Sequence, residues 1–139
     1  MVPDLTQGTD YVFRISAKNV IGYSTVSSEV TITASAVPST MSTITTANNG
    51  LNVDISWSAP SANGSSLTSY TIEFRKKDGS WATSTNCDTS TAVTSCSLAM
   101  TEFINDYNLV QGDLIAARGK AINAIGSSAS YSTVNTSGA

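Results

Sequence analysis

Residues 5–22, LTQGTDYVFRISAKNVIG, decide how the whole chain is interpreted. The middle of this stretch alternates large apolar residues with polar ones, which is the periodicity of a β-strand with one buried face. Residues 19–22 predict a turn, and residues 29–33 predict a returning partner strand. The stretch therefore predicts a β-hairpin. Its apolar face, where we expect contact with another domain or subunit, holds Tyr11, Phe13, Ile15, Val30 and Ile32.

The same stretch recurs near the end of the chain, in one register and without a gap. Residues identical in the two copies are Leu5 and Leu109, Gly8 and Gly112, Arg14 and Arg118, and Asn19 and Asn123. One supersecondary unit therefore occurs twice, at a spacing that fits a sandwich domain and is too long for a solenoid repeat. We interpret residues 1–36 as the C-terminal hairpin of a preceding domain, and residues 37–139 as a complete domain of the same kind.

Between the two copies, short alternating segments follow one another at the regular spacing of an all-β sandwich. No stretch shows a sustained helical period, although residues 101–108 are compatible with one helical turn. The expected strands cover residues 41–46, 51–57, 70–74, 95–100, 115–121 and 130–134, with a further short strand that begins at Trp81. The residues expected in the core are Trp57, Tyr70, Ile72, Phe74 and Leu98.

Three features of the sequence resemble fibronectin type III domains. They are Trp57 within ISWSAP, Tyr70 at the start of YTIE, and the closing motif L-x-x-G-x-x-Y-x-F-R-I-x-A-x-N-x-x-G of residues 5–22. The resemblance implies an all-β, seven-stranded, Ig-like β-sandwich, preceded by the F–G hairpin of another sandwich. The family's corner tyrosine is Tyr11 in the first copy, but Ile115 stands in its place in the second. We therefore expect the second corner to lack the hydroxyl that ties it.

Cys87 and Cys96 are the two cysteines of a chain that contains no histidine. Two ligands are too few for a zinc site. The secreted-type composition favours a disulfide over the alternative, a pair of reduced thiols, and the bond would stabilise the fold by roughly 2.7 kcal/mol. Cysteines between the fourth and fifth strands also resemble the tandem type III arrays on surface proteins of single-celled eukaryotes. That resemblance implies a tandem-repeat surface protein.

Asn63 and Asn135 each begin an Asn-x-Ser triplet, the acceptor signal for N-glycosylation. Asn63 is the better candidate, because residues 61–66 form a polar loop that we expect to be exposed. The alternative at both positions is an unmodified asparagine, since such triplets are frequent by chance in a chain rich in Ser and Thr.

Charge and motif content exclude several functional classes. With a net charge of −3 and only 12% charged residues, the chain lacks the basic surface that nucleic-acid binding needs. No apolar run approaches the length of a membrane span, and the first residues do not resemble a signal peptide. Without histidine, a phosphate-binding loop or a usable pair of carboxylates, no catalytic site can be assembled. We predict a non-enzyme without cofactor or metal.

Three functions fit such a module. We favour a non-catalytic structural repeat, extracellular or at the cell surface and glycosylated, that forms part of a rod or fibril. Its partners would be neighbouring repeats or identical subunits arranged head to tail. The first alternative is an adhesion module that binds a protein or glycan through the loops 61–66 and 123–128. The second alternative is a spacer domain of a secreted enzyme.

Overall fold

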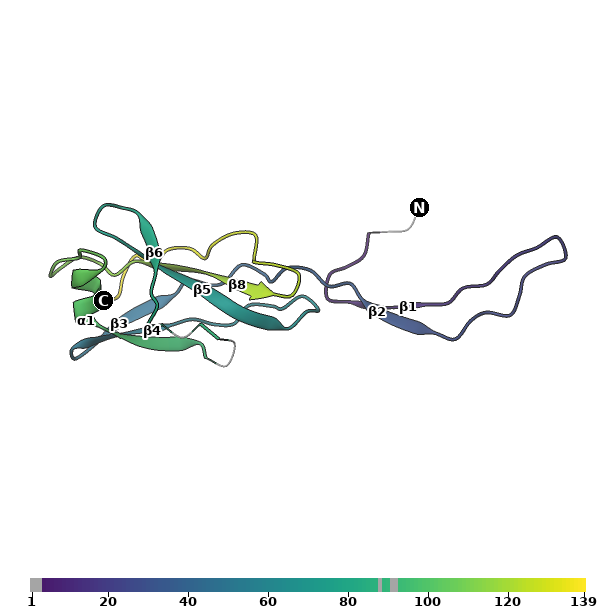
Figure 1. The fold of residues 1–139 in the computed structure, drawn as a ribbon, viewed down its shortest axis with the longest axis horizontal. Helices are drawn as coiled ribbons and strands as arrows, with labels where there is room; N and C mark the ends of the chain where they lie inside the picture. The colour runs from purple at the N-terminus through teal and green to yellow at the C-terminus, as the bar shows by residue number, and fades with distance from the viewer. Residues whose placement is uncertain (1–3, 88, 91–92) are drawn as a thin grey trace.

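The computed structural model describes residues 4–87, 89–90 and 93–139, so the first three residues of the expected unit 1–36 lie outside the described residues. A long β-hairpin extends from one end of a β-sandwich, and the C-terminus lies at the opposite end of that sandwich (Figure 1). The chain joins the hairpin to the sandwich through residues 34–44, which contain no strand or helix.

The hairpin consists of β1 (Asp10–Phe13) and β2 (Val30–Thr33), paired antiparallel. Tyr11 lies opposite Ile32 and Phe13 lies opposite Val30, so these apolar side chains share one face of the ribbon. Tyr11 is half-buried, whereas Phe13, Val30 and Ile32 are exposed. Beyond β1, Ile15 is 76% exposed. The expected apolar face is therefore present, and within the described chain nothing covers it.

One sheet of the sandwich contains β3 (Thr45–Asn49), β4 (Asn52–Ser56) and β7 (Ser95–Ala99), in the order β3-β4-β7. The turn between β3 and β4 contains Gly50, whose φ of 63° favours glycine. The expected strand 51–57 included Leu51, and at this residue the prediction is wrong, because β4 begins at Asn52. Leu51 belongs to the turn and is 87% exposed. The first strand also begins later than expected, at Thr45.

The second sheet contains β5 (Leu67–Arg75), β6 (Trp81–Thr83) and β8 (Ala117–Asn123), in the order β6-β5-β8. The short helix α1 (Met100–Asn105) follows β7 directly and contributes Phe103 to the core. Phe74 of β5 packs edge-on against Phe103 and Tyr107. The five residues expected in the core are all buried between the sheets: Trp57, Tyr70, Ile72, Phe74 and Leu98. The prediction of an all-β sandwich is confirmed.

The seventh expected strand, residues 130–134, runs beside β8 without forming a regular ladder. Its contacts combine backbone and side-chain groups. The Ser132 N–H donates to the Gly119 carbonyl at 2.8 Å, and the Gly119 N–H donates to Ser132 Oγ at 3.0 Å. Farther along, the Ala117 N–H donates to Asn135 Oδ1 at 2.6 Å. Side-chain oxygens thus take the place of carbonyls that a regular strand would supply.

Candidate functional site

The two copies of the repeated unit have the same local geometry. Asn19 N–H donates to the Gly22 carbonyl at 3.0 Å, and Asn123 N–H donates to the Gly126 carbonyl at 3.0 Å. In both turns the asparagine Oδ1 accepts the same pair of backbone amides, at 2.9 and 3.1 Å. The hairpin is therefore the structural equivalent of β8 and the segment that follows it.

Asn123 does more than close its turn, because its amide also holds the connection between hairpin and sandwich. The side chain is buried, and its Nδ2 lies near three backbone carbonyls. It donates to Ala36 at 2.8 Å, to Ala62 at 3.1 Å and to Ser65 at 3.2 Å. One amide group therefore joins the linker to the loop 61–66. The sequence identified Asn123 as repeated, but gave no sign of this contact.

Asn63 holds the next part of the linker. Its Nδ2 donates to the Val37 carbonyl at 2.9 Å and to Ser39 Oγ at 3.3 Å. Its backbone carbonyl accepts the Ala36 N–H at 2.9 Å. Residues 36–39 are thus held by the side chains of Asn123 and Asn63, which belong to two different loops, and by the backbone carbonyl of Asn63. We call this region, residues 34–39 with loops 61–66 and 123–128, the junction.

Gly64 allows the hairpin to approach the sandwich closely at the junction. Gly64 has a φ of 81°, and a Cβ placed on it would lie 2.8 Å from Thr33 Cγ2 and 3.1 Å from Gly8 Cα. Any side chain there would therefore push the hairpin away. The Gly64 carbonyl is held by Ser35 Oγ at 2.8 Å. Of the two loops expected to act as binding tips, loop 61–66 therefore faces the hairpin through Gly64, and loop 123–128 contacts the linker through Asn123.

The corner that precedes β8 is tied by a carboxylate instead of the missing tyrosine. In the first copy the Thr6 N–H donates to the Tyr11 hydroxyl at 2.7 Å. In the second copy the equivalent amide, that of Val110, donates to Asp113 Oδ2 at 2.9 Å. Lys77 Nζ lies 2.6 Å from Asp113 Oδ1. Its hydrogen bond, followed by that from Val110, lowers the pKa of the Asp113 carboxyl. The second corner lacks the tyrosine hydroxyl, as expected, and the Asp113 carboxylate takes over its hydrogen bond.

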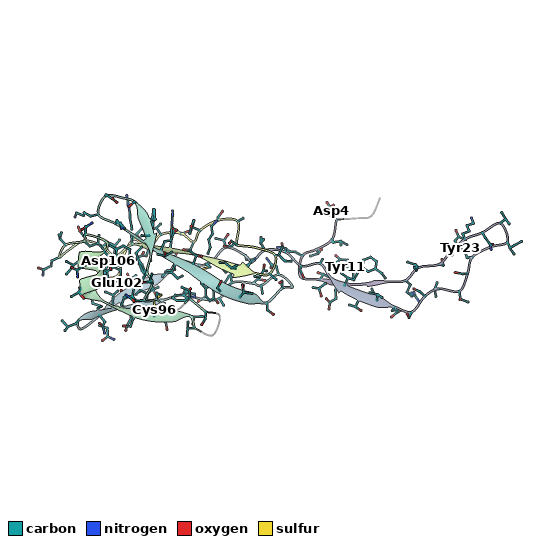
Figure 2. All side chains as sticks on the ribbon, viewed as in Figure 1. Asp4, Tyr11, Tyr23, Cys96, Glu102 and Asp106 are labelled. Carbon is teal, nitrogen blue, oxygen red and sulfur yellow. A yellow bond between two sulfur atoms is a disulfide. The ribbon has the colours of Figure 1, made fainter. Side chains whose placement is uncertain are left out.

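Cys87 and Cys96 form a disulfide, with a Cα–Cα distance of 5.4 Å. Cys96 belongs to β7, where it lies opposite Ile55, and Cys87 is buried against the core. The bond joins the loop after β6 to the edge of the β3-β4-β7 sheet. Figure 2 shows Cys96 within the sandwich, and Tyr11 and Tyr23 along the hairpin that extends from it.

The two candidate glycosylation sites have surroundings that differ from the expectation. Asn135 is only 5% exposed, and its Nδ2 donates to Thr46 Oγ1, to the Ile115 carbonyl and to the Ser137 carbonyl. A glycan is attached through this nitrogen, which at Asn135 is already engaged in these hydrogen bonds. Asn63 was expected to be exposed but is half-buried, and its Nδ2 is engaged in the junction.

Comparison with solved structures places the sandwich among known folds. The sixth type III domain of human fibronectin type III domain containing protein 3 is 19% identical and aligns with a TM-score of 0.54, covering 73% of this chain and 84% of that one. The fold is that of a fibronectin type III domain. No protein-family model and no curated protein matches the chain.

Two larger proteins also contain regions similar to this type III fold. A multidomain segment of titin is 21% identical with a TM-score of 0.51, over 92% of this chain and 40% of that one. The spore cortex lytic enzyme SleM of Clostridium perfringens is 16% identical with a TM-score of 0.52, over 70% of this chain and 27% of that one. The chain thus spans less than half of either protein, and these likenesses concern the fold alone.

The outer face of the type III sheet β6-β5-β8 has a cluster of stacked aromatic and cationic side chains. The Arg118 guanidinium lies 4.2 Å from the Trp81 ring centroid and 4.0 Å from that of Tyr131. It also pairs with Glu73 at 2.7 Å. Cation–π contacts of this kind stabilise the face.

The described part of the chain contains neither a metal-binding cluster of side chains nor a helix that could span a membrane. Within residues 4–87, 89–90 and 93–139 there is no group of three or more Cys, Asp or Glu side chains placed to hold a metal ion. None of the helices found there has the length and apolar character needed to cross a bilayer.

Proposed function

We propose that the chain is a segment of a tandem type III array outside the cell, and that its function is to hold successive modules in a fixed relative orientation. The junction carries this proposal. Its linker is short, and its backbone groups at Ala36 and Val37 are bound by side chains of the following sandwich. A linker held in this way transmits orientation, whereas a free one would act as a flexible tether.

The contacts within the junction also favour this function over adhesion through the loops. The loops 61–66 and 123–128 both bind the linker, and Gly64 of loop 61–66 also lies against Gly8 and Thr33 of the hairpin. Groups used in this way are not available to a protein or glycan partner. We therefore place the structural role ahead of the adhesion and spacer alternatives. The disulfide is consistent with a location outside the cytosol, and assembly into a rod follows if further modules continue the array.

The backbone dynamics of the linker in the full chain provide the test. We expect heteronuclear NOE values for residues 34–39 that match those of β5 and β8, as for a rigid backbone. The variant Asn123→Asp keeps the oxygen that closes the turn but loses the amide that donates to Ala36, Ala62 and Ser65. It should lower the NOE values of the linker while β5 and β8 keep theirs.

Asn19→Asp is the matched control. Asn19 closes an identical turn, and in the described chain its Nδ2 contacts neither the linker nor its loops. The substitution adds the same charge to the same type of turn, at an exposed position away from the linker, so linker NOE values should not change. A wild-type linker as mobile as a free peptide, or equal effects of the two substitutions, would refute the proposed function.

A further inference from the structure

The exposed face of the hairpin corresponds, residue by residue, to a buried face of the sandwich. The constant register of the repeat places Tyr11, Phe13 and Ile15 where the second copy has Ile115, Ala117 and Gly119. Ile115 is 3% exposed and Ala117 is fully buried. The equivalent hairpin residues are thus built to lie inside a sandwich, on the inner side of its F strand.

The two faces differ in the space that they need. A single Cβ added to Gly119 would lie 3.0 Å from Ile44 Cδ1, 3.0 Å from Ile72 Cδ1 and 3.1 Å from the Thr71 carbonyl oxygen. These contacts are already tight for one methyl group. Isoleucine at this position would place three more carbon atoms against Ile44 and Ile72. Phenylalanine in place of the fully buried Ala117 would add a ring to a filled core.

We propose that the hairpin is completed by five strands of a different type III sandwich, and not by a second copy of this chain. The inward side chains of that partner must be smaller than Ile44 and Ile72 at the equivalent positions, to leave space for Phe13 and Ile15. Strand exchange between identical chains is excluded by the same mismatch. The proposal goes beyond the junction and does not depend on whether the linker is rigid.

Asn19 indicates how the same partner is held. Its turn reproduces that of Asn123 in each hydrogen bond made by the side-chain oxygen. Asn123 Nδ2 binds three carbonyls of a linker and loop, whereas Asn19 Nδ2 meets no acceptor among the described residues. A completing sandwich would supply these carbonyls from its own linker. The partner is thus a sandwich with the same linker arrangement and a different core.

Transplanting the hairpin side chains into the sandwich tests the mismatch in the full chain. We expect the double variant Ala117→Phe/Gly119→Ile to lower the melting temperature by about 10 °C or more, because both residues overpack the core. Lys120→Ser is the control, since it introduces the hairpin's Ser16 on the outward side of β8 and should shift the melting temperature by only a few degrees. An unchanged melting temperature in the double variant would overturn the proposal.

A rescue experiment tests the predicted chemistry of the partner. Adding Ile44→Ala and Ile72→Ala to the double variant should recover at least half of the lost melting temperature, since both side chains bound the space above Gly119. Absence of recovery would overturn the assignment of smaller residues to the partner.

Hydrogen exchange of the wild-type chain gives a measurement that does not require a variant to fold. If a second copy completed the hairpin, the amides of β1 and β2 would become protected as protein concentration rises from micromolar to millimolar. We expect no such dependence. Concentration-dependent protection of these amides would overturn the proposal directly.

Discussion

The Asp113 carboxylate accepts the Val110 backbone N–H at 2.9 Å, and so ties the corner before β8. The first copy ties the equivalent amide with the hydroxyl of Tyr11. The two repeats therefore close the same corner with different chemical groups, a hydroxyl in one and a carboxylate in the other. The aspartate at the second corner also forms an ion pair with Lys77, which has no counterpart in the hairpin.

The tie at Asp113 predicts a dependence of stability on pH. The pKa of this carboxyl is lowered from 3.8 by the hydrogen bonds from Lys77 and Val110, so the folded state favours the ionised form. Its contribution is present above the unfolded pKa and is lost as pH falls through the folded pKa. Asp113→Asn should therefore lower the melting temperature at neutral pH, and the difference from wild type should shrink below about pH 3.

A control separates this effect from general acid sensitivity. Asp54, which accepts hydrogen bonds from Asn49 and Ser97 on an exposed sheet face, is an acidic residue outside the corner. Asp54→Asn should give no change in the amide shifts of Val110, whereas Asp113→Asn should move them. A difference between Asp113→Asn and wild type that stays constant from pH 7 to pH 2 would contradict the predicted linkage.

Asn135 is predicted to act as a structural residue and to carry no sugar. Its side chain accepts the Ala117 N–H and donates to three oxygens in a buried setting. Asn135→Ala should lower the free energy of unfolding by about 2–3 kcal/mol, because it leaves buried polar groups without partners. Denaturant titration measures this loss. Peptides from a glycosylating host should contain Asn135 unmodified, and a glycan there would show that our account of this edge is incorrect.

Gly64 is predicted to set the distance between the hairpin and the sandwich. Gly64→Ala places a methyl group against Thr33 and adds about 1–2 kcal/mol of backbone strain at its positive φ. Linker NOE values should fall. Thr33→Ser removes the colliding methyl group but can keep the hydroxyl that donates to Asp10 at 2.6 Å. Adding it to Gly64→Ala should restore part of the lost order, and no recovery would mean that backbone strain alone is responsible.

The disulfide is predicted to be present in the purified protein. Alkylation should leave the intact mass unchanged until a reductant is added, after which the mass should rise by two alkyl groups. Replacing both cysteines by serine should lower the free energy of unfolding by roughly 2.7 kcal/mol, the value for closing a loop of this length. Alkylation of both thiols without reductant would rule the bond out.

Much of the fold could be predicted from alternation of residue types alone. Val53, Ile55 and the inward residues of β5 repeat every second position, and the structure buries them. Leu51 follows the same alternation but lies in a turn, because two asparagines and a glycine before it already end β3. Periodicity cannot show where one strand stops and the turn begins.

The junction could not be predicted in the same way, because its contacts join residues far apart in sequence. Asn123 and Ala36 meet only when the sandwich is closed. Asn63 appeared as a glycosylation signal, since a three-residue motif carries no information on what the amide contacts. Asp113 was also missed, because its carboxylate accepts an amide three residues earlier and this does not match the Asx-turn, in which the side chain binds backbone two residues later.

The side-chain oxygens of Ser132 and Asn135, which accept backbone amides of β8, affect how neighbouring molecules can associate with this edge of the sheet. An ordinary edge strand presents a regular row of free amides and carbonyls, on which a strand of another molecule can add. Here Ser132 and Asn135 interrupt that row beside Gly119 and Ala117, so the flank of the sheet has no continuous register for a foreign strand to copy. If similar modules are strung together at high local concentration, this irregular flank would let each sandwich remain separate from its neighbours.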